Sequence, residues 1–234
     1  MNLNNAAVLI TGGSSGIGRA TAELLKAAGA RVAITGRDKA RLEEAAKALG
    51  VVGIVADVSK EADVLRTYAE VKEKLGGLDV LVNNAGIGVL KELTDLSLAE
   101  FESVFATNVT GAMLMGREAA KIFKAQNHGN IVNIASTASM RGAPKGTAYY
   151  GSKFALRGMT ECWRGELRKY NVRVFQVNPS EVITDFARRA GFAQKDNASK
   201  LRSEDIAHMI KAGLEMDDRG FTTELTVFAT NPID

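Results

Sequence analysis

The stretch Thr11-Gly12-Gly13-Ser14-Ser15-Gly16-Ile17-Gly18 decides the fold, because it separates a strand pattern from a helix pattern. Residues 6–11 are largely apolar, and after the loop Leu24, Leu25 and Ala28 recur at helical spacing. Glycines allow a tight turn and a close backbone approach, and the first turn of a helix offers unpaired N–H groups and a partial positive charge. The loop therefore predicts a binding site for the pyrophosphate of a dinucleotide.

The glycine spacing narrows this prediction. Gly-x-x-x-Gly-x-Gly differs from the general Gly-x-Gly-x-x-Gly fingerprint, and no Gly-Lys-Ser/Thr follows, which argues against a P-loop NTPase. A loop that is merely tight is the alternative interpretation. The residues expected to contact the dinucleotide here are Gly12, Ser14, Ser15, Gly16, Ile17 and Gly18.

The strand-helix alternation continues along the whole chain. Further strands are predicted at 31–35, 51–56, 79–82, 131–134, 172–177 and 225–228, and helices at 21–28, 39–49, 61–75, 98–125, 147–168 and 204–214. Continuous apolar strands followed by helices are typical of a parallel sheet that is buried on both faces. We therefore expect an α/β protein, a single-domain Rossmann fold with a doubly wound, seven-stranded parallel sheet flanked by helices.

Length and composition fit one globular domain. The 234 residues are 46% hydrophobic and 24% charged, and no linker or repeat divides residues 1–234. The formal net charge of +3 is too small to indicate a nucleic-acid or membrane partner, so a small molecule is expected. Residues 185–200 are polar and weakly patterned, and we expect a short substrate flap near 185–202.

Cysteine and histidine usage bears on compartment and metal binding. The only cysteine, Cys162, cannot form an intramolecular disulfide, and with only His128 and His208 the chain lacks the usual ligands of a structural zinc site. The sequence begins without a basic and apolar leader pattern, and no apolar run reaches the length of a membrane-spanning helix. We expect a cytoplasmic protein without a metal site.

The end of the second predicted strand bears on the cofactor. In the general Rossmann pattern an acidic residue about 20 positions after the loop accepts the ribose hydroxyls of NAD. Here the sequence is Thr35-Gly36-Arg37-Asp38, so Gly36 replaces a carboxylate that would repel a 2′-phosphate and Arg37 offers a guanidinium that binds one. The sequence predicts NADP(H). Asp38 is the competing ribose ligand, although its place before a helix favours an N-cap.

Tyr149 and Lys153 are four residues apart at the start of a predicted helix, so they share one face. A phenol is a weak acid at neutral pH, and a neighbouring ammonium group would favour its ionised form. Tyr150 lies three residues from Lys153 and is the less favoured candidate. A packed tyrosine beside a solvated lysine is the alternative interpretation of the pair.

Read together, the motifs resemble the short-chain dehydrogenase/reductase family over almost the whole chain, and NADP-dependent 3-ketoacyl-carrier-protein reductases among its members. The motifs appear in that family's order, including the 13-residue step from Ser136 to Tyr149. They are the glycine-rich loop, Asn83-Asn84-Ala85-Gly86, Asn108, Ser136, Tyr149-x-x-x-Lys153 and Asn178-Pro179.

The resemblance implies a role for each matching residue. Tyr149 would protonate a carbonyl oxygen, Ser136 would hydrogen-bond the same oxygen, and Thr137 and Ser139 miss the spacing. Lys153 would hold the nicotinamide ribose and lower the pKa of the tyrosine, and Asn108 would hold a water linked to Lys153. The remaining cofactor contacts implied are Asp57, Val58, Asn84, Ala85, Gly86, Pro179, Val182 and Thr184, with Ser180 standing where the family usually has glycine.

The resulting hypothesis is an NADP(H)-dependent oxidoreductase that reduces a ketone, aldehyde or 3-oxoacyl thioester. A non-catalytic NADP-binding sensor is the alternative, and a methyltransferase would have no use for the tyrosine-lysine pair. The flap residues Arg188, Arg189, Lys195, Lys200 and Arg202 could bind an acidic substrate or simply face solvent. Family members pair the helices at 98–125 and 147–168, so a homodimer or homotetramer is expected.

Overall fold

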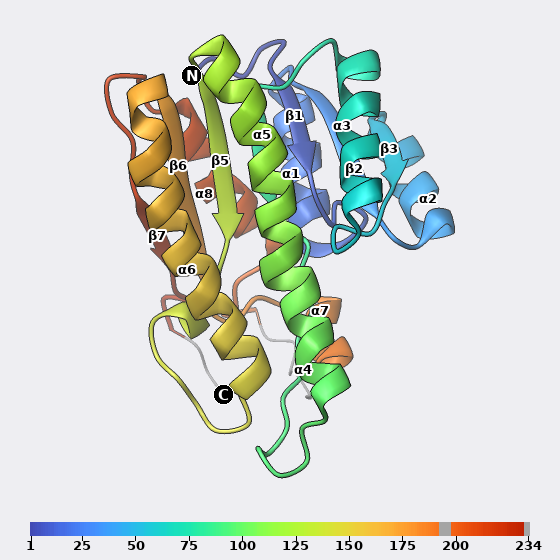
Figure 1. Ribbon diagram of the computed structural model, residues 1–234, viewed down its shortest axis with the longest axis vertical. Helices are drawn as coiled ribbons and strands as arrows, with labels where there is room; N and C mark the ends of the chain where they lie inside the picture. Colours follow the sequence, from blue (N-terminus) through green and yellow to red (C-terminus); the bar gives the residue numbers. More distant parts are fainter. Residues whose placement is uncertain (192–197, 232–234) are drawn as a thin grey trace.

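The computed structural model describes residues 1–191 and 198–231. Their seven parallel strands form one sheet in the order β3-β2-β1-β4-β5-β6-β7 (Figure 1). The strands are β1 (Ala7–Ile10), β2 (Arg31–Gly36), β3 (Val52–Val55), β4 (Val80–Asn83), β5 (Gly129–Ile134), β6 (Val172–Pro179) and β7 (Glu224–Val227). This confirms the predicted doubly wound parallel sheet.

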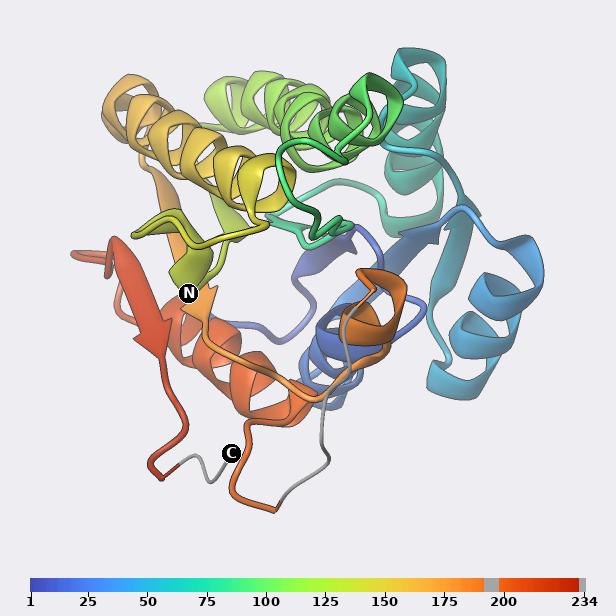
Figure 2. The same ribbon diagram turned by 90° about the horizontal axis from the view of Figure 1, so that it is seen from below.

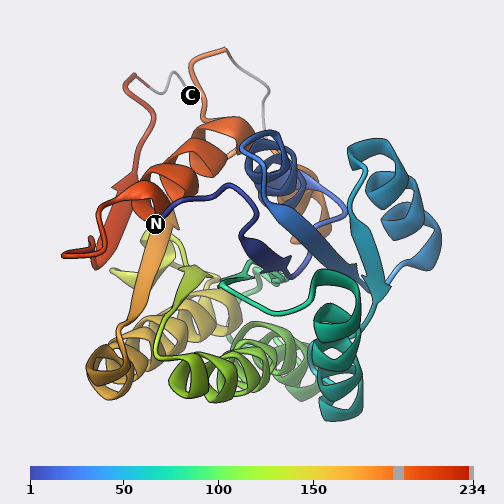
Figure 3. The ribbon, with the colours of Figure 1, turned by 90° about the horizontal axis from the view of Figure 1, so that it is seen from above.

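Helices cover both faces of the sheet (Figures 2 and 3). One face carries α1 (Gly16–Ala27), α2 (Lys39–Leu49) and α8 (Ser203–Glu215), and the other carries α3 (Glu61–Leu75), α5 (Ala112–Gln126) and α6 (Thr147–Leu167). The remaining helical segments are α4 (Leu98–Phe105), a π-helical turn (Ala106–Gly111), α7 (Asp185–Arg189) and two 3₁₀ turns (Thr137–Ser139 and Arg168–Tyr170).

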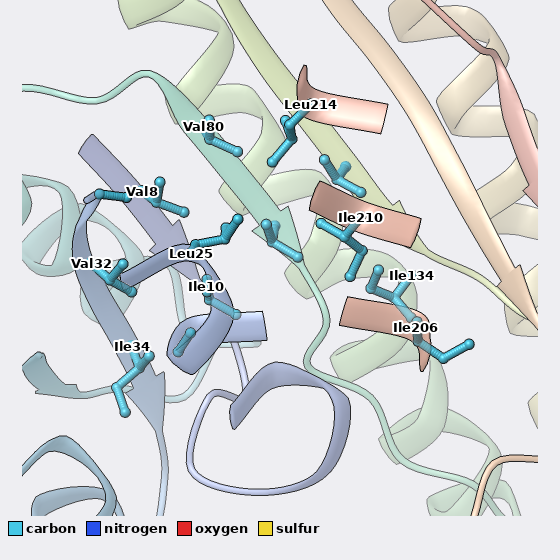
Figure 4. Packing of buried hydrophobic residues seen from close by; sticks show 14 of the residues in the cluster. Val8, Ile10, Leu25, Val32, Ile34, Val80, Ile134, Ile206, Ile210 and Leu214 are labelled. Atoms are coloured by element: carbon cyan, nitrogen blue, oxygen red, sulfur yellow. The ribbon is translucent and has the colours of Figure 1, made fainter. Parts of the chain in front are cut away.

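The central strands are apolar on both faces because each face meets a helix layer. Val8 and Ile10 of β1 pack with Leu25 of α1, and Ile210 of α8 joins the same cluster (Figure 4). The alternate residue Leu9 points into the opposite cluster, beneath α3 and α5. Burial on both faces explains the continuous apolar runs.

The sheet order positions the site. From β1 the chain winds one way through β2 and β3, and it then returns to the other side of β1 as β4. The loops that follow β1 and β4 therefore diverge at the carboxyl edge of the sheet and leave a crevice between them, which is where ligands bind in such sheets. The glycine-rich loop follows β1, and Asn84-Ala85-Gly86 follows β4.

Two predicted helices differ from the structure. The first begins at Gly16 rather than at residue 21, because the loop glycines already belong to its first turn. The predicted continuous helix at 98–125 is interrupted by the π-helical turn, where a Cβ on Gly111 would lie 2.6 Å from Cγ2 of Val58 and where Asn108 turns inward. Single π turns inside α-helices are frequent at functional sites. Part of the predicted flap, residues 192–197, lies outside the described residues.

Candidate active site

A cavity of about 1110 Å³ occupies the crevice at the carboxyl ends of the strands. It brings together most of the predicted site residues from seven segments of the chain. Those that line it are Gly12, Ser14, Ser15, Gly16, Ile17, Arg37, Asp57, Val58, Asn84, Ala85, Gly86, Ser136, Tyr149, Lys153, Pro179, Val182 and Thr184. Gly18 and Asn108 lie behind its wall.

The glycine-rich loop favours glycine at three positions, either because of the backbone conformation or because a side chain would have no room. Gly12 and Gly16 have left-handed backbones, with φ of +65° and +54°. A Cβ on Gly12 would lie 3.0 Å from Cα of Ala85. A Cβ on Gly18 would lie 2.5 Å from both Nδ2 of Asn84 and the carbonyl oxygen of Gly12, so Gly18 allows α1 to pack against the loop after β4.

Hydrogen bonds hold the two loops together. Nδ2 of Asn84 donates to the carbonyl oxygens of Thr11 and Gly12 at 2.9 and 3.1 Å, and the N–H groups of Asn84 and Ala85 both donate to Oγ1 of Thr11 at 3.0 Å. Ser15 is the N-cap of α1 without a side-chain cap among the described residues, so the first N–H groups of the helix face the cavity. The resulting cradle fits a pyrophosphate.

Charged side chains gather at one end of the cavity. Nη1 of the exposed Arg37 lies 4.0 Å from Oδ2 of Asp57, whose Oδ1 accepts from the N–H and hydroxyl of Ser59 at 3.0 and 2.8 Å. Asp38 accepts from the N–H of Arg41 at 3.1 Å, which confirms the N-cap interpretation. Arg41 also lines the cavity, and sequence reasoning missed it, although a second cation one turn into the helix was the available signal.

The opposite end holds the predicted catalytic side chains. Ser136 follows β5, and Tyr149 lies in the first turn of α6. Burial raises the pKa of Tyr149 to about 12, a hydrogen bond with Ser136 partly counters that rise, and the neighbouring Tyr150 adds to it. The phenol is therefore protonated at neutral pH and can donate a proton. Tyr150 packs edge-on against Tyr149, with ring centroids 5.9 Å apart, and does not line the cavity.

Lys153 is buried one turn beyond the phenol. Its Nζ donates to the carbonyl oxygen of Ile134 at 2.7 Å and lies 5.8 Å from the ring centroid of Tyr149. Burial lowers the pKa of Lys153 to about 8. The expectation that Lys153 lowers the pKa of Tyr149 therefore differs from what is found here, because burial dominates the phenol and the ammonium is directed at a main-chain carbonyl.

Asn108 holds the loop after β4 from behind. Its Oδ1 accepts from the N–H of Ile87 at 2.9 Å, and its Nδ2 donates to the carbonyl oxygen of Ile87 and to Oγ of Ser152, both at 2.9 Å. Ser152 donates in turn to the carbonyl oxygen of Tyr149 at 2.7 Å. Asn108 thus connects the cavity wall to the first turn of α6, and its role toward a water stays a prediction.

The segment after β6 closes the remaining side. The N–H of Ser180 donates to the carbonyl oxygen of Val227 at 2.9 Å, which anchors the position at which this sequence departs from the glycine usual in the family. Thr184 is the N-cap of α7, and its hydroxyl accepts from the N–H of Phe186 at 3.3 Å. Phe186 and Arg189 of α7 also line the cavity, and no sequence pattern had singled out Phe186.

In the described part of the chain, no three His, Cys, Asp or Glu residues are grouped as a metal ion would require. Within the same residues, no helix combines the length and apolarity needed to cross a bilayer.

Comparison with known proteins gives consistent results. A family model described as short chain dehydrogenase matches residues 6–197. The NADP-dependent 3-hydroxy acid dehydrogenase of Schizosaccharomyces pombe is 32% identical over 98% of this chain and 94% of its own length. An uncharacterized oxidoreductase of Staphylococcus saprophyticus is 31% identical over 97% and 98%.

Solved structures agree over the same span. The 3-ketoacyl-(acyl-carrier-protein) reductase of Brucella melitensis, complexed with NADH, has a TM-score of 0.90 at 31% identity and covers 96% of this chain and 97% of its own. The alcohol dehydrogenase of Thermococcus sibiricus, complexed with 5-hydroxy-NADP, has a TM-score of 0.88 at 29% identity and covers 98% and 100%.

Proposed function

The chain belongs to the short-chain dehydrogenase family, an oxidoreductase family that uses nicotinamide cofactors, and we propose that it reduces a ketone, aldehyde or 3-oxoacyl thioester to the alcohol with NADPH. One observation carries the proposal. Ser136, Tyr149 and Lys153 line one end of a cavity whose other end is a glycine-rich cradle at a helix N-terminus. A dinucleotide bound along that cavity would present its nicotinamide beside the phenol.

The residues have distinct tasks in this proposal. When bound, a nicotinamide cofactor would supply the hydride that the carbonyl carbon accepts. Tyr149, protonated at neutral pH, donates its proton to the carbonyl oxygen, and the Ser136 hydroxyl donates a hydrogen bond to the negative charge that develops there. Lys153 would hold the ribose hydroxyls of the cofactor and would add positive charge near the phenol. Asn108 and Ser152 position the first turn of α6 through their hydrogen bonds.

Preference for NADP(H) rests on the charged end of the cavity. Arg37 and Arg41 both line it, beside Asp57 and Asp38 with which they pair, and Gly36 adds no third carboxylate. Two guanidinium groups favour a 2′-phosphate, since each can form charge-assisted hydrogen bonds to it. The relative from Schizosaccharomyces pombe is named as NADP-dependent. The other cofactor contacts proposed are Asp57 and Val58 at the adenine, and Pro179, Val182 and Thr184 at the nicotinamide.

We also propose a homodimer or homotetramer in the cytoplasm. Leu98 of α4 and Phe154 of α6 are exposed apolar side chains on the two helices expected to pair, and the free, exposed Cys162 suits a reducing compartment. Light scattering at micromolar concentration tests the assembly, and a monomer there would contradict it.

A substrate panel tests the activity. NADPH oxidation is followed at 340 nm with acetoacetyl thioesters, simple diketones and aldehydes, and NADPH binding is measured separately by fluorescence. The proposal expects turnover of at least one carbonyl class with NADPH preferred over NADH. NADPH binding without oxidation of any member would favour the non-catalytic sensor instead.

A further inference from the structure

We propose that Phe186 of α7 sets the size limit of the substrate site, admitting small uncharged carbonyl compounds, and that Gly88 fixes where its ring lies. This inference rests on the proposed function, because it concerns the same cavity. It adds two residues that no sequence motif singled out and that face the reacting end.

Phe186 forms a wall beside the proton donor. Its ring centroid lies 5.2 Å from that of Tyr149, with the two planes inclined by 50°, and both residues line the cavity. A substrate whose carbonyl oxygen reaches the Tyr149 hydroxyl must therefore place a substituent against or past the Phe186 ring. α7 lies at the end of the sheet toward which the strand arrows point (Figure 1).

The Phe186 ring packs directly against Gly88. A Cβ at this position would lie 2.7 Å from Cζ and 3.1 Å from Cε1 of Phe186, and 3.1 Å from Cβ of Ala190. Gly88 is not among the glycines with a positive φ. The glycine is therefore required for space rather than for backbone conformation, and any side chain here would displace the wall.

The wall is held by packing. Ala187 and Ala190 of α7 are buried, and Thr184 caps the helix. The segment before α7 is tied to the last residues of the flap: Val182 bridges Leu201 in parallel, and the N–H of Ile183 donates to the carbonyl oxygen of Leu201 at 2.9 Å. Nζ of Lys200 also donates to Glu181 at 2.9 Å. These ties restrict how far Phe186 can withdraw.

The character of the wall points to an uncharged, apolar substituent. Ile87, Val89 and Ile183 line the cavity together with Phe186. The charged residues of α7 that line it, Asp185 and Arg189, form an ion pair at 3.4 Å. A small ketone with an alicyclic group would bury apolar surface against this wall, whereas a carboxylate placed against the same apolar side chains would lose its hydration.

Two ketones of different size test the inference. Cyclohexanone and 4-phenylcyclohexanone are compared by calorimetric affinity for the protein-NADP⁺ complex and by kcat/KM with NADPH, in the wild type, Phe186→Ala and Phe186→Leu. For each measurement we take the ratio of the value for the larger ketone to the value for the smaller one. We expect Phe186→Ala to raise this ratio by about tenfold or more, both for affinity and for kcat/KM, because deleting atoms from a pocket wall relaxes discrimination by this order. Phe186→Leu should raise it by less. Phe228→Ala, at an exposed phenylalanine outside the cavity lining, is the matched control.

A double-mutant cycle tests the role of Gly88. In the wild-type background, Gly88→Ala should change the ratio of the larger to the smaller ketone in affinity and in kcat/KM. In the Phe186→Ala background it should have much less effect, because the ring that the added Cβ would contact is gone. Gly158→Ala, where a Cβ would meet nothing within 4 Å, controls for substitution of a glycine, and thermal unfolding checks that each variant folds.

The outcomes separate the two proposals. A wild-type protein that oxidises no NADPH with any carbonyl compound contradicts the proposed function. The calorimetric affinities for the two ketones then still show whether Phe186 limits the size of the ligand. A ratio in folded Phe186→Ala or Phe186→Leu within about twofold of the wild type, or a wild type that binds the larger ketone as well as the smaller, overturns the size limit.

Discussion

The two ends of the cavity are built from different parts of the polypeptide. At the phosphate end the chain offers mainly backbone: Gly12 and Gly16 with positive φ, and a helix N-terminus without a side-chain cap. At the catalytic end it offers side chains, namely Ser136, Tyr149 and Lys153, with the pKa values of the last two shifted by burial. The phosphate end therefore depends on the absence of side-chain atoms at its glycines, whereas the catalytic end depends on how its side chains are packed.

This difference predicts different responses to mutation. Backbone groups cannot be deleted, so the phosphate end is damaged only by adding atoms or changing charge, and the damage should appear in cofactor affinity. Side chains can be deleted one at a time, so damage at the catalytic end should appear in kcat. The following variants test that separation.

Tyr149→Phe removes the proton donor and carries the largest expected effect. We expect kcat for carbonyl reduction to fall by about 10² to 10⁴, because general acid catalysis contributes on that order. The dissociation constant for NADPH, measured by fluorescence, should change little. Tyr150→Phe, which alters a ring outside the cavity lining, is the control, and near-normal turnover by Tyr149→Phe would contradict the assignment.

The pH profile of kcat/KM reports on the same end. Lys153 loses its charge as the pH rises through about 8, whereas Tyr149 keeps its proton to about 12. If the lysine acts as a cation, kcat/KM for reduction should be level below pH 8 and fall toward tenfold per pH unit above it. A profile that stays level to pH 10 would contradict that role.

The lowered pKa of Lys153 also predicts the direction in which stability changes with pH. Because the pKa of Lys153 in the folded protein lies below the ordinary value of 10.5, the unfolded chain binds more protons between pH 8 and 10.5. The contribution of Lys153 to the free energy of unfolding should therefore rise over that window. Lys153→Met should remove this pH-dependent contribution. The change in the denaturation midpoint between pH 8 and 10.5 should therefore differ between the variant and the wild type by the contribution of Lys153.

Arg37→Asp acts on the phosphate end through charge. We expect the preference for NADPH over NADH, measured as a ratio of kcat/KM values, to fall by about 10- to 100-fold, since a hydrogen bond to a charged group contributes roughly 1.5–3 kcal/mol. An unchanged ratio would refute the assignment of Arg37. Arg219→Asp, at a highly exposed side chain outside the cavity lining, controls for net charge.

Gly18→Ala acts on the same end through space. The added Cβ would meet Nδ2 of Asn84 and the carbonyl oxygen of Gly12, both at 2.5 Å. We expect a loss of about 1–3 kcal/mol in the free energy of unfolding and roughly tenfold weaker NADPH binding, with kcat at saturating NADPH nearly retained. Gly158→Ala again serves as control, and equal effects of the two would show that packing at Gly18 is unimportant.

The sequence predicted most accurately what local chemistry decides. Helix α2 was placed at its observed bounds because Asp38 caps one end and Gly50, with φ of +63°, ends the other. Helix α3 ends in the same way at Gly76. The phosphate loop and the tyrosine-lysine spacing are also local patterns, and apart from Gly18 the site residues predicted from them line the cavity.

The sequence could not reveal what depends on distant contacts. The π-helical turn that interrupts the predicted helix at 98–125 accompanies the approach of Gly111 to Val58, which are far apart in the chain. Phe186 reaches Tyr149 only because α7 folds back over the loop after β4. The raised pKa of Tyr149 follows from burial, which the four-residue spacing to Lys153 does not encode.

Thr160→Val probes how the catalytic end is held, and its expected effect on rate is small. Nδ2 of Asn133 in β5 donates to Oγ1 of the buried Thr160 in α6 at 2.8 Å, and Nδ2 of Asn83 in β4 donates to Oδ1 of Asn133 at 3.0 Å. Valine would leave a buried amide hydrogen without its partner, so urea denaturation should show a loss of about 1–3 kcal/mol.

Because this bond ties the sheet that carries Ser136 to the helix that carries Tyr149, we also expect kcat to fall by a small factor while NADPH affinity stays unchanged. Thr160→Ser keeps the hydroxyl and should restore kcat. If the valine variant weakened NADPH binding and left kcat intact, the catalytic end would not depend on side-chain packing in the way that distinguishes it from the phosphate end.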